Sequence, residues 1–128
     1  MKLLLDTHAF IWWDENPSRL GPAANRACFD PANALILSVA SVWEIQIKLA
    51  LGKLQLAKPL RQMLADQVQL NGLEILPVNL EHALRLDTLP SIHKDPFDRL
   101  LIAQAIVESC SFVSHDQEIA RYPVPVIW

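Results

Sequence analysis

Short apolar runs alternate with longer segments of helical spacing along the whole chain, and this alternation constrains the fold more than any other feature. The predicted strands cover residues 1–5, 34–38, 74–78, 111–114 and, at an edge because of Pro125, 124–128. The runs are apolar on both faces, which is typical of parallel strands covered by helices on both sides. The sequence therefore predicts an α/β fold with a central parallel sheet of four to five strands.

The segments between these runs are predicted to be helices, because apolar residues recur at helical spacing and proline or glycine marks the ends. They cover residues 8–15, 22–30, 40–51, 59–71, 79–86 and 95–109. Gly52 follows one of them as a natural C-terminal cap. No repeat, linker or low-complexity tract interrupts the pattern, so we expect residues 1–128 to form a single domain.

Composition and charge exclude several classes of protein. Apolar residues make up 52% of the chain and charged residues 20%, which is typical of a folded globular protein. No apolar run is long enough to cross a membrane, and Asp6 and His8 break the only stretch that resembles a signal peptide, so we expect a cytoplasmic protein. The net charge of −3 argues against nucleic-acid binding by charge alone, although a bound metal ion can hold phosphates in an acidic protein.

Four acids stand where a ligand site is expected. Ligands of open parallel sheets bind beyond the carboxyl ends of the strands. Asp6 directly follows the first predicted strand, and Asp116 comes just after the fourth. Glu44 lies in the helix after the second strand, and Asp98 lies in the first turn of the helix before the fourth. These carboxylates will meet at one edge of the sheet if the order of the strands permits it.

Each acid also has a purely structural explanation. Asp6 and Asp116 can cap the helices that follow them. Glu44 can pair with Lys48 one turn later, which is worth about 0.3–0.5 kcal/mol on an exposed helix face. Asp98 has the spacing of a capping box with Asp95. Taken singly, each of these explanations is at least as good as a functional one.

The surroundings of two of the acids favour a metal site. Glu44 and Asp98 lie on helices that are apolar on most sides, where a carboxylate is costly unless something pairs with it. The neighbouring basic residues Lys48 and Arg99 are too few to neutralise four acids, and clustered carboxylates raise one another's pKa values. Mg²⁺ or Mn²⁺ resolves this conflict, because both ions prefer carboxylate oxygens.

Four stretches carry a family resemblance in matching order and spacing over nearly the whole chain. They are LLLDTHAFIWW, SVWEIQIK, HKDPFDRLLIAQA (residues 93–105) and FVSHD (residues 112–116). They resemble the PIN-domain family, and especially the VapC-type toxin ribonucleases of type II toxin–antitoxin modules. The stretch DPFDRLLIAQA is the most specific of them.

The resemblance implies a three-layer PIN-like domain and an endoribonuclease that depends on Mg²⁺ or Mn²⁺. Its catalytic and metal-binding acids fall on Asp6, Glu44, Asp98 and Asp116. Thr7 and Ser114 match hydroxyl positions that can bind a metal-bound water, whereas Asp95 is left to cap its helix. The resemblance further implies an RNA substrate, a cognate antitoxin and a homodimer, and it leaves the identity of the RNA and the number of metal ions open.

Two other functions remain as alternatives. A receiver-like signalling domain also carries a Mg²⁺ site at strand ends, but Thr7 stands where it would have a second acid. A non-catalytic interaction module with the same fold would not need four acids. Among the other candidates, we interpret His8 and His93 as structural hydrogen-bond donors before general acids, and Trp12 and Trp13 as core or dimer contacts before base-stacking platforms.

Overall fold

The structure is a computed structural model that describes residues 1–128. Its strands are β1 (Lys2–Leu5), β2 (Ala34–Ser38), β3 (Glu74–Leu76), β4 (Ser111–Val113) and β5 (Val126–Ile127). Its α-helices are α1 (Thr7–Glu15), α2 (Pro22–Cys28), α3 (Val39–Ala50), α4 (Leu60–Asn71), α5 (Leu80–Arg85) and α6 (Pro96–Val107). Short 3₁₀ helices cover η1 (Pro17–Arg19), η2 (Leu86–Thr88) and η3 (Ile119–Arg121). None of the helices is long and apolar enough to cross a membrane.

All five strands pair in parallel in the order β3-β2-β1-β4-β5. The chain therefore starts in the centre of the sheet, runs outward through β2 and β3, and returns to the other side of β1 for β4 and β5. The prediction of a parallel α/β sheet with its last strand at an edge is confirmed. The strand order reverses between β1 and β4, which is the point where open α/β sheets usually bind their ligands.

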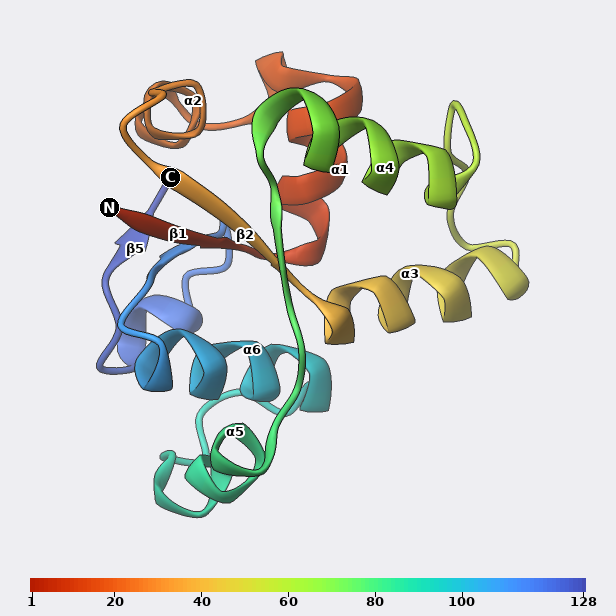
Figure 1. Cartoon of the computed structure of the whole chain (residues 1–128). Coiled ribbons are helices and arrows are strands. Elements are labelled where there is room, and N and C mark those ends of the chain that lie inside the picture. The colour runs from red at the N-terminus through yellow and green to blue at the C-terminus, as the bar shows by residue number, and fades with distance from the viewer.

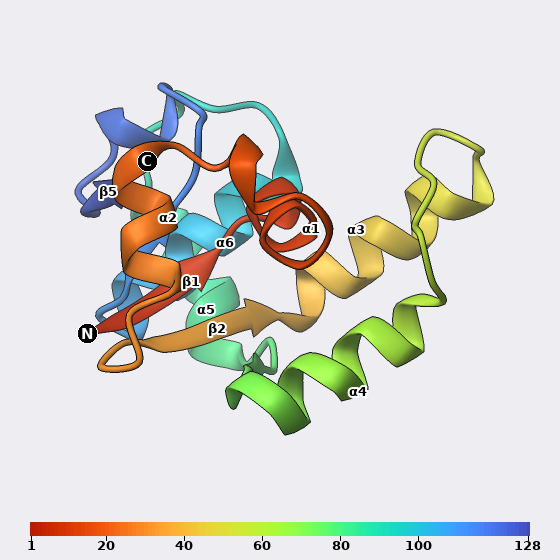
Figure 2. The same ribbon diagram turned by 90° about the horizontal axis from the view of Figure 1, so that it is seen from above.

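The helices cover both faces of the sheet, giving three layers (Figures 1 and 2). Successive side chains of a strand point to opposite faces. Leu3 and Leu5 pack into the apolar cluster that includes α1, α2 and α4, and Leu4 packs into the cluster that includes α6. All three side chains are fully buried, and burial of each contributes roughly 1.5–3 kcal/mol. The apolar run at the start of the chain thus builds both halves of the core.

Helices begin almost directly at the carboxyl ends of the central strands. Asp6 alone separates β1 from α1, and its side chain caps α1 by accepting a hydrogen bond of 2.7 Å from the backbone N–H of Ala9. Ser38, the last residue of β2, caps α3 in the same way through the N–H of Ala40. This edge of the sheet is therefore formed by helix N-termini, whose free N–H groups and dipoles favour negative charge.

The predicted helix ends agree with the structure where glycine or proline sets them. Gly52 and Gly72 follow α3 and α4 with φ angles of +68° and +65°, the left-handed conformation that glycine adopts without strain. The strand predicted over 74–78 instead ends at Leu76, since Pro77 has no N–H to continue the ladder. Ser109, which the sequence analysis assigned to α6, lies beyond its end with φ of +56°.

Candidate active site

A cavity of about 440 Å³ opens at the carboxyl ends of β1 and β4. It is lined almost entirely by polar and charged side chains: Asp6, Thr7, His8, Trp12, Glu44, Lys48, Asp95, Asp98, His115 and Asp116. The four acids singled out from the sequence therefore all face one space, although they lie on four different segments of the chain. The reversal of strand order next to β1 brings these segments together.

Asp6 joins the central strand to α1 and lies at the base of this cavity. Besides capping α1, its carboxylate interacts with the Ser114 hydroxyl at the end of β4. Burial raises the pKa of Asp6 above its usual value, and the hydrogen bonds from Ser114 and Ala9 only partly oppose this. The Asp6 carboxyl group thus both caps α1 and lines the cavity.

Glu44 reaches the cavity from α3 and is held in place by Thr7 and Lys48. Its Oε1 accepts a hydrogen bond of 2.6 Å from Thr7 Oγ1, which also lies 3.1 Å from Ser41 Oγ. Its Oε2 pairs with Lys48 Nζ at 2.8 Å. The side chain of Glu44 is only 9% exposed, so this pair lies on a largely buried face and not on the open helix surface considered above. The Thr7 hydroxyl anchors Glu44, and the water-binding role that the resemblance implied for it stays a prediction.

The start of α6 is arranged so that Asp98 is free to face the cavity. Asp95 caps the helix as expected, accepting hydrogen bonds from the N–H groups of Phe97 at 2.8 Å and Asp98 at 3.4 Å. A capping box would return a bond from the Asp98 side chain to the N–H of Asp95. Here that N–H donates instead to Nδ1 of His93 at 3.1 Å, so the capping-box explanation for Asp98 is wrong.

His93 links two of the acids, although its sequence position favoured a structural role. Its Nε2 lies 2.7 Å from Asp116 Oδ2 and 3.2 Å from Asp98 Oδ2. Because Nδ1 accepts the hydrogen bond from Asp95, Nε2 carries a hydrogen and is the donor to the carboxylates. The signal in the sequence is the position of His93 two residues before a helix cap, which turns its ring back over the first turn of α6.

The pKa values of Asp98, His93 and Asp116 are all shifted, and burial and the charges of near neighbours explain the shifts. Burial, together with the nearby Asp95 charge, raises the pKa of Asp98 to about 7 despite the attraction of His93. Burial also opposes both charges of the His93–Asp116 pair, but their mutual hydrogen bond outweighs it, raising the pKa of His93 and lowering that of Asp116. Without a further cation, the site therefore favours a charged His93–Asp116 pair beside an Asp98 carboxyl group that keeps its proton until near neutral pH.

The donor set of the cavity fits a divalent cation. Lys48 and His93 are the only basic side chains in ion pairs with the four acids. One ligand atom from each of His93, Asp98 and Asp116 lies within 4.8 Å of the others, so the two carboxylates are close enough to share one ion, and His93 would join them if Nε2 lost its hydrogen. Hard carboxylate oxygens suit Mg²⁺ and Mn²⁺, and an ion in the cavity would stabilise the ionised forms of Asp6 and Asp98, whose pKa values are raised mainly by burial.

Residues 3–125 match the family model of the PIN domain. The chain belongs to the PIN-domain family. Ribonuclease VapC22 of Mycobacterium tuberculosis (strain ATCC 25618 / H37Rv) is 34% identical over 132 residues, covering 98% of both chains. The resemblance inferred from the sequence motifs is thus confirmed, and the DPFDRLLIAQA stretch contributes Asp98 to the cavity of this PIN domain.

Solved structures show the same PIN fold at low sequence identity. VapBC2 from Rickettsia felis, bound to a DNA fragment from its promoter, matches with a TM-score of 0.71 and 17% identity over 98% of this chain and 97% of the other. FitAcB from Neisseria gonorrhoeae matches with a TM-score of 0.62 and 20% identity over 97% and 95%. The predicted three-layer arrangement is confirmed. PIN-domain ribonucleases generally depend on a divalent metal, which agrees with the donor set of the cavity.

Proposed function

We propose that this PIN-domain protein is a divalent-metal-dependent endoribonuclease and the toxin of a toxin–antitoxin pair. One observation carries the proposal: Asp6, Glu44, Asp98 and Asp116 line a single cavity at the point where the strand order reverses. The 34% identity to Ribonuclease VapC22 over nearly the full chain supports RNA as the substrate. The net charge of −3 agrees with an enzyme that engages phosphate through a cation.

Asp6 and Asp98 would hold the ion most directly, with Mg²⁺ or Mn²⁺ as the candidates. When bound, such an ion neutralises charge on a phosphodiester and lowers the pKa of water. Glu44, fixed by Thr7 and Lys48, is set to complete the ligand set or to orient the attacking water. Asp116 has the same two possible roles on the other side of the cavity, where the Nε2 hydrogen of His93 fixes its position.

Three further parts of the proposal concern partners and location. Relatives of the same fold were solved as toxin–antitoxin complexes, so we expect a small cognate antitoxin that copurifies with this chain. A homodimer and action in the cytoplasm complete the proposal. We also take residues 1–128 to be one domain, in line with the family match over residues 3–125.

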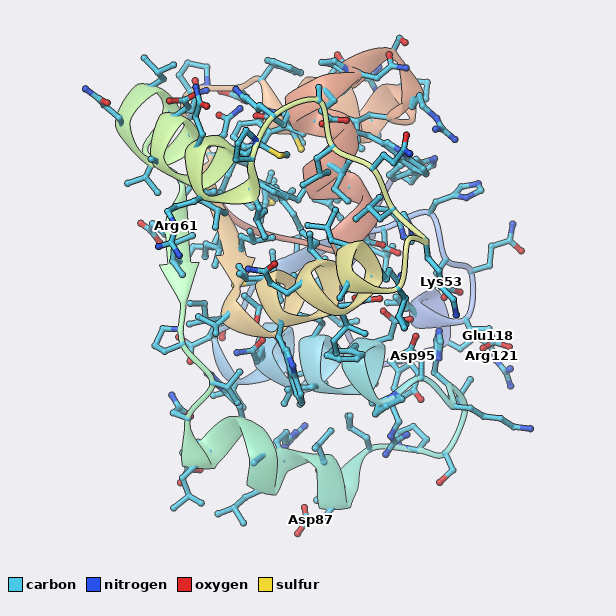
Figure 3. All side chains as sticks on the ribbon, turned by 90° about the vertical axis from the view of Figure 1, so that its right-hand side faces the viewer. Lys53, Arg61, Asp87, Asp95, Glu118 and Arg121 are labelled. Carbon is cyan, nitrogen blue, oxygen red and sulfur yellow. The ribbon has the colours of Figure 1, made fainter.

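The test compares carboxylate-to-amide variants inside and outside the cavity. Asp98→Asn and Asp6→Asn keep side-chain volume but remove a charge that the ion requires, so each is expected to lower RNA cleavage at least roughly 100-fold. Asp87→Asn is the matched control, because Asp87 is exposed in η2 on the side of the molecule away from Asp95 and the cavity (Figure 3). Cleavage is measured on purified protein with Mg²⁺ or Mn²⁺ added after EDTA treatment.

Thermal unfolding and metal titration separate loss of function from loss of fold. All three variants should unfold cooperatively, and only the two cavity variants should lose the heat of Mn²⁺ binding in calorimetry. Undiminished cleavage by Asp98→Asn would refute the proposed chemistry. A wild-type protein that gives neither Mn²⁺ heat nor cleavage would instead favour the non-catalytic interaction module.

A further inference from the structure

Four aromatic rings contact one another in succession, and three of them line the acidic cavity. We refer to His8, Trp12, Trp128 and His115, in this order, as the aromatic row. Successive ring centroids lie 5.8, 5.8 and 5.3 Å apart, within the range of direct aromatic contact. His8, Trp12 and His115 line the same cavity as the four acids. The row therefore borders the space in which a phosphate would meet the metal ion.

Packing constraints hold the far end of the row in place. Pairing of β5 with β4 and a hydrogen bond from the Ser114 N–H to the Ile127 carbonyl fix the last residues of the chain. The C-terminus then lies beside the start of α2 (Figure 2). A Cβ atom at Gly21 would come within 2.6 Å of Trp128, so only glycine permits this contact. Trp128 is thus a fixed support for the His115 ring.

Exposure distinguishes the row from ordinary core packing. Trp13, the neighbour of Trp12 in α1, is 4% exposed and belongs to the core. Trp12 and Trp128 are half-buried, whereas His8 and His115 are exposed. The two tryptophans therefore back two imidazole rings that face solvent at the mouth of the cavity. The interpretation of Trp13 as a core residue holds, but Trp12 also lines the cavity, a position that the sequence did not reveal.

A positive charge accompanies the row. The Arg19 guanidinium carbon lies 4.5 Å from the centroid of the Trp12 ring. Arg19 is exposed and forms no ion pair with any acid of the chain. The Arg19 side chain is therefore free to contact an RNA phosphate beside the cavity. Such a contact would oppose the repulsion between the cavity carboxylates and the RNA backbone.

We propose that the aromatic row binds an unpaired base of the RNA next to the phosphate that is cut, while Arg19 contacts a neighbouring phosphate. This inference rests on the proposed ribonuclease function and deepens it by naming the residues that hold the base beside the cut. Stacking on aromatic rings provides affinity that does not depend on a basic surface, which this chain of net charge −3 lacks. Bases within a duplex are already stacked and present no free face to the row.

Exposed imidazoles allow a test that leaves the fold intact. His8→Ala, His115→Ala and the double variant are assayed on a short unstructured RNA at fixed Mn²⁺ concentration. Each ring removed should raise KM roughly five-fold or more, with kcat within about two-fold of the wild type, because stacking contributes to binding and not to the chemical step. Phe29→Ala is the control, since Phe29 is an exposed aromatic residue outside the cavity and should leave KM unchanged.

Abasic RNA identifies the contact itself. Removal of the single base on one side of the cut should weaken binding to the wild type by the same factor as the double histidine substitution. The same removal should cost the double variant nothing further, because the ring and base act as a pair. Equal KM values for wild type and double variant, or an abasic penalty that persists in the double variant, would overturn the proposal.

A binding readout separates this inference from the proposed function. Fluorescence anisotropy of a labelled RNA, with Ca²⁺ in place of Mg²⁺, reports affinity without cleavage. An active wild type whose RNA affinity is unchanged in the double variant refutes the aromatic row alone. An inactive wild type whose affinity for RNA falls with the same substitutions refutes the nuclease chemistry and leaves the base-binding row standing.

Discussion

Asp98 shows how a single residue reveals the chemistry of this site. Its carboxyl group lies at the start of α6, largely buried and in contact with His93, and its side chain is 22% exposed. Burial and the charge of Asp95 raise its pKa to about 7, from an ordinary value of 3.8. The folded protein thus holds a proton on Asp98 that the unfolded chain releases, over the whole interval between these values. A cation that binds Asp98 must displace this proton.

Stability of the metal-free protein is predicted to depend on this group. A raised carboxyl pKa means that stability falls as pH rises from about 4 to about 7, and the full penalty is present above pH 7. Asp98→Asn mimics the neutral form, so it should raise the melting temperature in EDTA by at least roughly 3 °C at pH 8 and by less at pH 4.5. Differential scanning calorimetry at the two pH values, with Asp87→Asn as control, measures this. A larger gain at pH 4.5 than at pH 8 would show that burial of Asp98 is not the cause.

Helix ends are the elements that build the cavity. Asp6 caps α1 and Asp98 lies in the first turn of α6. Glu44 comes from the middle of α3, which begins directly after β2. The sequence allowed these helices to be predicted because proline, glycine and Asx residues mark their ends. It could not show that the Asp95 N–H would donate to the His93 ring and not to the Asp98 carboxylate. Both outcomes are compatible with the same sequence, in which Asp95 caps the helix.

Substitutions of Asp95 distinguish a helix cap from a metal ligand. Asp95→Ala removes the acceptor for two N–H groups of α6 and should lower the free energy of unfolding by about 1 kcal/mol. Asp95→Asn retains an oxygen that can cap the helix, so stability and RNA cleavage should both stay near wild type. Urea unfolding and the cleavage assay on the two variants check this. A loss of Mn²⁺ affinity in Asp95→Asn with unchanged stability would make Asp95 a ligand.

At the scale of the whole molecule, strand order decides whether the acids meet. The sequence located the strands correctly, but nothing in their composition shows that β4 lies beside β1. Local patterns report which face of an element is buried, whereas the neighbours of a strand depend on the packing of all layers together. The family resemblance supplied that information indirectly. His8, His93 and His115 lie close to the acids in sequence, but a lone histidine is more often structural than functional. The contacts of His93 with Asp116 and of Trp12 with Trp128 join distant segments, so the sequence could not show them.

An exposed apolar face on α3 is predicted to form the interface of the proposed homodimer. Val39, Trp43 and Ile47 recur at the spacing of one helix face and are all exposed, with Trp43 62% exposed and packed edge-on against Phe97 of α6. A contiguous patch of this kind is typical of an interface, and we assign it to the proposed homodimer. Trp43→Asp should convert a dimer to a monomer in light scattering, whereas Phe29→Asp should not. A dimer that persists in Trp43→Asp would exclude this face.

The central position of β1 has a consequence for synthesis of the protein. Asp6 is synthesised early, yet β4 and Asp116, which lies just beyond that strand, follow much later in the chain. A nascent polypeptide therefore cannot bring the four acids together until the segment that follows β4 has been synthesised and β4 has paired with β1. Until then the cavity lacks His115 and Asp116 from its lining.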